Sequence, residues 1–321
     1  MNTNIASLPS SARVLVTGGA GFIGSHLVEH LVGCGSKVAV VDNLSQGRRE
    51  NLAPVLDRVD LRVGDMGDLL KRGELQVERY DYIFHLAANS YIPPSVEDPA
   101  FDYRANLENT FLLLDAIRRT AVPVRLVNTS TAGVYGDPAR IPIHEEDVTV
   151  PISPYGVSKL AGERYAAVYA RLYGVRVNSL RLFSVFGPRQ KKQVVFDFLA
   201  KLKANPAELE VLGDGTHERD FVYATDVVQA MILAATVAPG QGEVYNVASG
   251  RTITIADLAT LVCRLRGGQP RIHFTGKARP GDAVKWVVDI ARLKALGYRP
   301  QMALEAGLSA VVAWFDGLAE P

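Results

Sequence analysis

Two side chains suited to acid–base chemistry, Tyr155 and Lys159, lie four positions apart in the stretch Ser-Pro-Tyr-Gly-Val-Ser-Lys. The Ser-Pro pair predicts that a helix begins there, and residues four apart on a helix occupy one face, a turn apart. Because a nearby ammonium stabilises a phenolate, the spacing predicts that the pKa of Tyr155 falls towards neutrality and that its phenol takes a proton from a hydroxyl. Removal of that proton while a hydride leaves the same carbon is alcohol oxidation.

A glycine turn near the start of the chain predicts the hydride acceptor. The glycines of Gly18–Gly24 are spaced G-x-x-G-x-x-G between a β-branched run and a helical stretch. In such a turn, backbone N–H groups at a helix N-terminus bind the pyrophosphate of a dinucleotide. Asp42 ends the next apolar run about 20 residues later, where a carboxylate binds the adenosine ribose hydroxyls and repels a 2′-phosphate. The pattern therefore predicts NAD in preference to NADP, and Arg48 and Arg49 weaken that preference slightly.

Further cofactor contacts are expected where the third and fourth apolar runs end. Asp65 and Met66 follow the third run, at a position suited to the adenine edge, although Asp65 is nearly as well suited to a turn. Small residues follow His85, where a cofactor must pass close to the backbone, and His85 itself is expected to be packed and hydrogen-bonded and not catalytic. The residues predicted to contact the cofactor are Gly18, Gly21, Phe22, Ile23, Gly24, Asp42, Asn43, Asp65, Met66, Leu86, Ala87, Ala88, Tyr155 and Lys159.

Hydroxyl side chains follow one another at the end of the fifth apolar run, in Asn128-Thr-Ser-Thr. At the carboxyl edge of a sheet they can bond a substrate alcohol and complete a relay with the tyrosine and the lysine. Thr131 is the predicted relay residue, with Ser130 as the close alternative.

The elements that must position these groups alternate along the first part of the chain. Apolar β-branched runs at 14–16, 37–42, 61–63, 82–86, 124–127 and 175–181 are separated by helical stretches. Continuous apolar runs fit strands that are covered on both faces, so we expect an α/β fold with a Rossmann-like doubly wound parallel sheet. The pattern changes after Gly187. We expect a dinucleotide-binding domain over residues 1–187 and, mainly over 188–321, a smaller mixed α/β lobe with interleaved segments.

The bulk composition limits the class, the partners and the location. A chain of 321 residues with 48% hydrophobic and 21% charged residues can bury a sizeable core. Lys plus Arg (35) nearly balances Asp plus Glu (34), so no overall field indicates nucleic acid or a membrane surface as partner. Cys34 and Cys263 lack metal-ligand spacing and predict reduced thiols, no metal site and a cytoplasmic location. No signal peptide is evident, and the longest apolar stretch, about 227–238, is too short to span a bilayer.

Two loop arginines suggest a second diphosphate besides that of the cofactor. Arg219 lies in Gly-Asp-Gly-Thr-His-Glu-Arg-Asp-Phe, and Arg279 begins Arg-Pro-Gly-Asp, which ends at Asp282. A guanidinium held in place suits bidentate binding of phosphate oxygens. The substrate is therefore expected to carry a diphosphate, although loop arginines are often merely solvated.

Together these residues resemble the extended short-chain dehydrogenase/reductase superfamily, in particular its NAD-dependent nucleotide-sugar epimerases and dehydratases. The resemblance runs from about residue 12 to 318. It is carried by Thr17–Gly24, Tyr155-x-x-x-Lys159, Phe186–Arg189, Gly213-Asp-Gly, Arg219–Phe221, Asp226-Val227 and Arg279–Asp282. It implies a tightly bound, recycled NAD, oxidation of the sugar at C4 to a 4-keto intermediate, and a homodimer formed by helices near 104–119 and 155–173. The ketone is then reduced on its other face, or loses water or carbon dioxide.

The resemblance favours UDP-hexose 4-epimerisation, with departures that leave an alternative open. The 4,6-dehydratases are similar to one another in a Thr-Asp-Glu run, and Thr131-Ala-Gly lacks that acid and base. Ser184 replaces a common asparagine, and Trp286 stands where a bulky indole can hinder rotation of the ketone. A dehydratase with an unconventional acid and base therefore stays possible, with Lys191 and Lys192 among its candidates. The residues implied to bind substrate are Tyr91, Thr131, Ser184, Val195, Phe196, Arg219, Arg279, Asp282 and Trp286.

Two other classes are weighed against this hypothesis. An NADPH-dependent sugar reductase is disfavoured by Asp42, and a non-catalytic dinucleotide sensor has no need of both Tyr155 and Lys159. Among sugars, glucose, its uronic acid and N-acetylglucosamine derivatives all stay open.

Overall fold

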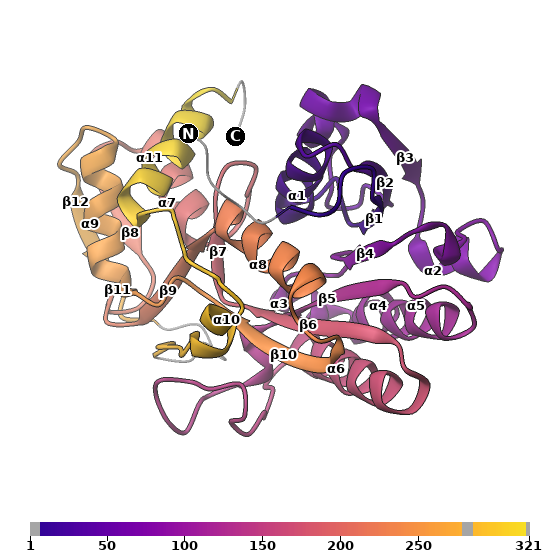
Figure 1. Ribbon diagram of the computed structural model, residues 1–321. Helices are drawn as coiled ribbons and strands as arrows, with labels where there is room; N and C mark the ends of the chain where they lie inside the picture. Colours follow the sequence, from indigo (N-terminus) through magenta and orange to yellow (C-terminus); the bar gives the residue numbers. More distant parts are fainter. Residues whose placement is uncertain (1–6, 278–284, 319–321) are drawn as a thin grey trace.

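A seven-stranded parallel sheet forms the centre of the molecule in the computed structural model, which describes residues 7–277 and 285–318 (Figure 1). The spatial order of its strands is β10-β6-β5-β4-β1-β2-β3. These strands are β1 (Arg13–Thr17), β2 (Lys37–Asp42), β3 (Val59–Val63), β4 (Tyr82–His85), β5 (Arg125–Thr131), β6 (Arg176–Leu182) and β10 (Gln241–Val247). The predicted doubly wound α/β sheet is confirmed.

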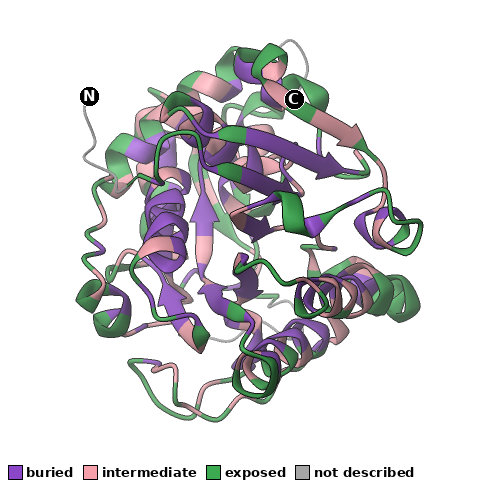
Figure 2. Cartoon of the chain, turned by 45° about the vertical axis from the view of Figure 1, so that its right-hand side comes forward, coloured by how far each residue is buried: buried purple, intermediate pink, exposed green. Residues whose placement is uncertain are grey.

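Helices cover both faces of this sheet, as its continuous apolar strands require. In β1, Val14 and Val16 belong to one core cluster and Leu15 between them belongs to the other, and all three are fully buried. In Figure 2 the central strands and the inner sides of the helices are accordingly purple. The elements on the first face are α1 (Phe22–Gly33), η1 (Arg49–Arg58) and α8 (Ala224–Thr236). Those on the second are α2 (Met66–Lys71), α5 (Asn109–Arg118) and α6 (Pro154–Tyr173).

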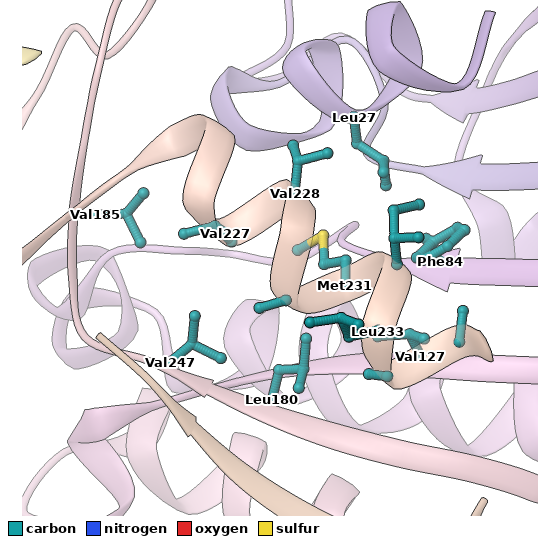
Figure 3. Packing of buried hydrophobic residues seen from close by; sticks show 14 of the residues in the cluster. Leu27, Phe84, Val127, Leu180, Val185, Val227, Val228, Met231, Leu233 and Val247 are labelled. Carbon is teal, nitrogen blue, oxygen red and sulfur yellow. The ribbon is translucent and has the colours of Figure 1, made fainter. Parts of the chain in front are cut away.

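The helix α8 packs against the first face of the sheet mainly through apolar side chains. Val228 and Met231 project from it between Leu27 of α1 and Phe84 of β4 (Figure 3). All four side chains are at most 1% exposed. This packing fixes α1, and with it the glycine turn, against the sheet.

The position of a ligand crevice follows from the strand order. β1 and β4 are neighbours, and the chain leaves the carboxyl end of β1 towards β2 and that of β4 towards β5, in opposite directions. Parallel sheets bind their ligands at such a reversal point. The turn after β1 and the residues after β4 therefore face each other at this edge.

A smaller mixed lobe stands beside the sheet, on the left in Figure 1. It contains a three-stranded sheet in the order β11-β9-β7 and a two-stranded sheet of β12 and β8. Its strands are β7 (Ser184–Phe186), β8 (Glu208–Val211), β9 (Glu218–Tyr223), β11 (Thr252–Thr254) and β12 (Arg271–Phe274). Its helices are α7 (Gln193–Ala204), α9 (Ile255–Leu265) and α11 (Leu304–Asp316), which enclose a separate apolar core.

The chain passes between the two parts more than once. β7 follows directly on β6, and α8 and β10 return from the lobe to the main sheet. The remaining short elements are η2 (Val77–Arg79), α3 (Ile92–Glu97), α4 (Pro99–Asp102), η3 (Tyr103–Glu108), η4 (Ala132–Val134) and α10 (Ala291–Ala295). Within the described ranges, no helix has the length and apolarity needed to cross a membrane.

Candidate active site

The helix α6 carries Tyr155 and Lys159 at the carboxyl edge of the sheet. Its first turn is fixed by Ser153, whose hydroxyl accepts a hydrogen bond from the Gly156 N–H at 3.1 Å, and by Pro154 at the first helical position. A Cβ at Gly156 would lie 2.7 Å from the carbonyl oxygen of Gly133. Glycine therefore lets the start of α6 contact η4, the turn that follows β5.

This close approach brings Thr131 to Tyr155. The Thr131 side chain, at the end of β5, hydrogen-bonds the phenol, and its hydroxyl also accepts the Gly133 N–H at 3.1 Å. Ser130 is 3% exposed, and its hydroxyl has no hydrogen-bond partner among the described residues. Of the two predicted relay residues, Thr131 is therefore the one that the structure joins to the tyrosine.

Burial dominates the electrostatics of the pair. It raises the pKa of Tyr155 to about 12, the bond from Thr131 opposes the rise, and the charge of Asp102 adds to it. Burial also lowers the pKa of Lys159 to about 8, against the raising effect of Glu163 and Asp102. The predicted fall of the Tyr155 pKa is wrong for the protein's own groups, because desolvation of the phenolate outweighs the hydrogen bond from Thr131.

His85 is neutral and structural, as predicted from the sequence. Its Nδ1 lies 2.8 Å from the Thr17 hydroxyl and its Nε2 lies 3.1 Å from the Thr110 hydroxyl. The Thr110 hydroxyl donates to the Asn106 carbonyl, so Nε2 must be the protonated ring nitrogen. Burial, together with the charge of Lys159, lowers the pKa of His85 to about 3.

The turn after β1 fits the pyrophosphate of a dinucleotide. Gly18 has a φ of 70°, and a Cβ there would lie 2.6 Å from the Ala87 nitrogen. α1 begins after Gly21 with no side-chain cap and no acidic residue in its first turn, as far as the described residues extend. Its first N–H groups and its positive end are therefore available to an anion. Phe22, Ile23, Leu86, Ala87 and Ala88 are half-buried around this turn.

Asp42 ends β2 next to the same turn. Its carboxylate accepts hydrogen bonds from the N–H groups of Ala20 at 2.9 Å and Leu44 at 2.8 Å. Burial raises the pKa of Asp42, and these two bonds oppose the rise. Each carboxylate oxygen keeps a second lone pair, so the group can still accept ribose hydroxyls. The exposed Asn43 accepts bonds from Ser45 at 2.7 and 3.0 Å.

Asp65 and Met66 take structural positions. The Asp65 carboxylate caps α2 by accepting the Asp68 N–H at 3.2 Å, and Met66 is 2% exposed in the core. Asp65 thus fills the turn position that the sequence allowed, and its contact with the adenine edge stays a prediction.

Of the residues predicted to bind substrate, Arg219 and Trp286 lie together. The guanidinium carbon of Arg219 is 5.1 Å from the centre of the Trp286 ring, and that ring meets Phe183 edge to face at 6.0 Å. The buried indole N–H of Trp286 has no hydrogen-bond partner in the described part of the chain. Ser184 begins β7 and is half-buried. Arg279 and Asp282 lie outside the described residues.

The other predicted substrate residues are more scattered. Val195 is 3% exposed in the core of the lobe, where Phe196 packs against Phe315 at 5.4 Å between ring centres. Tyr91 precedes α3, and the ammonium of Lys192 lies 5.3 Å from its ring centre. The same ammonium donates to the Gln46 side chain.

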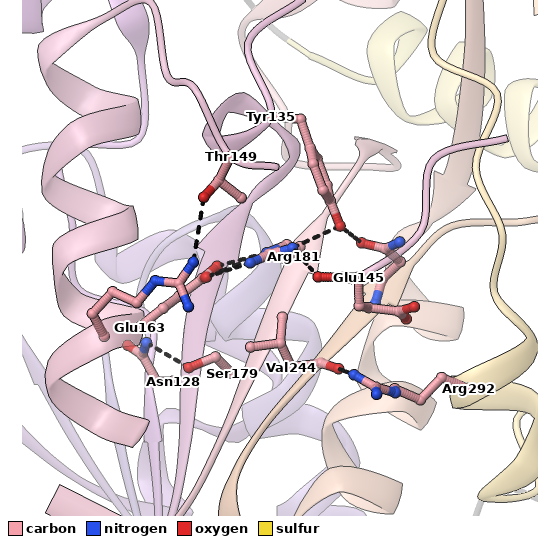
Figure 4. A network of polar contacts seen from close by, with 11 residues as sticks. Asn128, Tyr135, Glu145, Thr149, Glu163, Ser179, Arg181, Val244 and Arg292 are labelled. Carbon is pink, nitrogen blue, oxygen red and sulfur yellow. Dashed lines mark hydrogen bonds and ion pairs between the residues drawn. The ribbon is translucent and has the colours of Figure 1, made fainter. Parts of the chain in front are cut away.

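A buried ion pair that the sequence did not reveal stabilises α6. Glu163, one turn beyond Lys159, binds Arg181 of β6 through contacts of 2.8 to 3.3 Å (Figure 4). Both side chains are 2% exposed. Arg181 also donates to the Tyr135 phenol at 2.8 Å and to the Glu145 carbonyl at 3.0 Å. The only sequence signal was a charged residue inside an apolar run.

Comparison with known proteins agrees with this geometry. The model of the NAD dependent epimerase/dehydratase family matches residues 14–248. The UDP-glucose 4-epimerase of Mycolicibacterium smegmatis is 37% identical over 94% of this chain and 98% of its own length.

Two solved structures share the fold over almost their whole length. A UDP-N-acetylglucosamine 4-epimerase from Methanobrevibacter ruminantium, in complex with UDP-N-acetylmuramic acid, has a TM-score of 0.88 and 32% identity and covers 96% of this chain and 99% of its own. A dTDP-glucose 4,6-dehydratase from Streptomyces venezuelae with NAD bound has a TM-score of 0.86 and 30% identity and covers 95% and 97%.

Proposed function

Because the chain belongs to the NAD dependent epimerase/dehydratase family, we propose that it is a nucleotide-sugar 4-epimerase whose substrate is a UDP-hexose. The observation that carries the proposal is the convergence of Thr131, Tyr155 and Lys159 at the carboxyl edge of the sheet. The charge of Lys159 acts on His85, which bonds Thr17 directly before the glycine turn. The reaction is redox-neutral, so the same NAD serves each turnover.

Three side chains of the protein are assigned to the transfer of the sugar hydroxyl proton. Tyr155 accepts the proton of the sugar 4-hydroxyl, Thr131 orients that hydroxyl, and the ammonium of Lys159 stabilises the phenolate. NAD held by the glycine turn and Asp42 would supply a positively charged ring able to accept and return the C4 hydride. Because the pKa of Tyr155 is about 12 without that charge, the phenol is expected to ionise only in the cofactor-bound enzyme.

The substrate diphosphate is assigned to Arg219, whose guanidinium lies over Trp286. Stacking on an aromatic ring holds a guanidinium in a fixed plane, which suits bidentate binding of phosphate oxygens. Arg279 is proposed as its partner from the sequence alone. The uridine base is proposed from the UDP-sugar epimerases among the relatives.

Epimerisation is favoured over dehydration by η4. Dehydration needs an acid and a base near the sugar, and Ala132 and Gly133 offer neither beside Thr131. Dehydration is retained as a second candidate because the Lys192 ammonium lies 5.3 Å from the centre of the Tyr91 ring, so that a phenol and an amine stand together there.

A homodimer is supported by an apolar surface on two neighbouring helical segments. Phe111 of α5 and Tyr165 of α6 are in contact at 5.6 Å between ring centres and are 36% and 42% exposed. Val168 and Leu172 extend the surface along α6 with exposed fractions of 48% and 64%. A cytoplasmic location is proposed on the free thiols of Cys34 and Cys263.

The direct test is incubation of the purified protein, without added cofactor, with UDP-glucose, UDP-glucuronate and UDP-N-acetylglucosamine, read by mass spectrometry and NMR. A product of unchanged mass with inverted C4 supports the epimerase. A product lighter by one water supports dehydration instead. Tyr155→Phe must abolish turnover and keep NAD bound, and an active variant would overturn the assigned base.

A further inference from the structure

A buried carboxylate with no assigned function, Asp102, lies against the catalytic helix. It is the last residue of α4 and is 0% exposed. Its Oδ2 accepts a hydrogen bond from the hydroxyl of Ser158 at 2.7 Å, and Ser158 immediately precedes Lys159 on α6. The negative charge of Asp102 is therefore held beside the lysine's own backbone.

The other partners of Asp102 are neutral amides. Its Oδ1 accepts from the side chains of Asn89 at 3.0 Å and Asn106 at 2.9 Å. The Asn106 amide also donates to the Asn89 carbonyl at 3.1 Å. Within the described part of the chain, the carboxylate is thus surrounded by hydrogen-bonding dipoles and forms no contact ion pair.

The backbone that follows Asp102 has an uncommon helical conformation. The residues after Asp102, Tyr103–Glu108, form a π-helical turn between α4 and α5, and this turn packs on α6. A π turn inside a helix is uncommon and is frequent at functional sites. Here Asp102 and Asn106 lie on the side that meets α6, so that both are buried at the helix interface.

Lys159 needs a counter-charge because it is only 5% exposed. The negative charge that raises the pKa of Lys159 most is that of Glu163. Arg181 already neutralises this carboxylate through the buried ion pair. The remaining titratable groups that face the lysine are Tyr155 and His85, and neither is an anion at neutral pH. Among the described residues whose charge raises the pKa of Lys159, Asp102 is therefore the one without an ion-pair partner.

We propose that Asp102 is the counter-ion of Lys159, a positioning residue that keeps the lysine charged next to Tyr155 during turnover. The proposal rests on the catalytic function assigned to that pair. Burial alone lowers the pKa of Lys159, while the charges of Glu163 and then Asp102 raise it, to give a value of about 8. Loss of the Asp102 charge must therefore deprotonate the lysine at a lower pH.

The test is Asp102→Asn in the NAD-loaded enzyme. An asparagine can accept the two amide bonds through Oδ1 and donate to Ser158 through Nδ2, so the variant removes the charge and keeps the contacts. Competitive acetylation of Lys159, followed by mass spectrometry as a function of pH, reports the amine directly and needs no turnover. The expected midpoint for Asp102→Asn lies about one pH unit below that of the wild type.

Two controls distinguish the loss of the Asp102 charge from a change in the structure around it. Ser158→Ala removes one hydrogen bond and keeps the carboxylate, so its midpoint must stay at the wild-type value. The alkaline limb of the kcat profile must move with the acetylation midpoint in Asp102→Asn, so that activity recovers when the pH is lowered. A folded Asp102→Asn enzyme with an unmoved midpoint overturns the proposal, even if Tyr155→Phe confirms the relay itself.

A measurement on the native chain covers the case in which Asp102→Asn does not fold. In protein labelled with ¹³C at the aspartate carboxyl carbons, the Asp102 resonance is identified by its loss in Asp102→Glu. It must shift at the pH at which Lys159 loses its proton. A resonance that does not respond at that pH refutes the pairing.

Discussion

Replacing Glu163 by glutamine leaves the Arg181 guanidinium without its anion in the interior of the protein. Both side chains are 2% exposed, so water cannot replace the lost partner. Breaking a buried pair in this way costs about 3–5 kcal/mol. Arg181 keeps its bonds to the Tyr135 phenol and the Glu145 carbonyl, and a glutamine oxygen can still accept one bond. We therefore expect the free energy of unfolding of Glu163→Gln to fall by about 3 kcal/mol, the lower end of that range.

The assay is urea denaturation at a fixed NAD concentration, because a bound cofactor adds its own stabilisation. Asp115→Asn is the matched control: it removes a carboxylate that pairs with Arg118 and Arg119 at the exposed end of α5, where a loss of at most about 1 kcal/mol is expected. The double variant Glu163→Leu with Arg181→Met should recover much of the lost stability, since it leaves no buried charge. The reasoning is refuted if Glu163→Gln is no more destabilised than Asp115→Asn.

Three further predictions concern the cofactor and the lysine. Gly24→Ala should lose most of its NAD affinity, measured by titration calorimetry on the apoprotein, because its Cβ would lie 2.2 Å from the Gly18 carbonyl oxygen and displace the turn. The kcat profile should fall as the pH rises through about 8, where Lys159 loses its proton, and a profile flat to pH 10 would contradict that assignment. Lys192→Ala should release NAD several-fold faster than Lys191→Ala, because only Lys192 bonds Gln46 in the loop after β2, and equal rates in a stopped-flow fluorescence assay would exclude this contact.

The parts of the site that could be predicted are those encoded within a few residues. The glycine turn, the start of α6 and the apolar strands each depend on local backbone preferences, so their spacing alone indicated the sheet and its ligand edge. Thr131 ends β5 where η4 begins and bonds Tyr155, and its function in the relay stays a prediction.

The parts that could not be predicted depend on residues brought together from a distance. Asp102 lies 13 positions from Asn89 and 56 from Ser158, and neither Asp102 nor Asn89 belongs to a motif that would indicate this contact. The error in the Tyr155 pKa has the same origin. Spacing on a helix reveals the neighbouring ammonium, whereas the desolvation of the phenol depends on every element packed around it.

One aromatic contact explains how the two parts of the protein share a single site. Phe183 stands between β6 and β7, and its N–H donates to the Val247 carbonyl at 3.1 Å, which ties it to the edge of the main sheet. Its ring touches Trp286 on the substrate side, at 6.0 Å, and Tyr135 on the other, at 6.3 Å. Tyr135 in turn bonds Arg181 of the buried ion pair. Packing in the free protein therefore connects the arginine assigned to the substrate diphosphate with the catalytic helix, so their relative orientation does not have to be created by substrate binding.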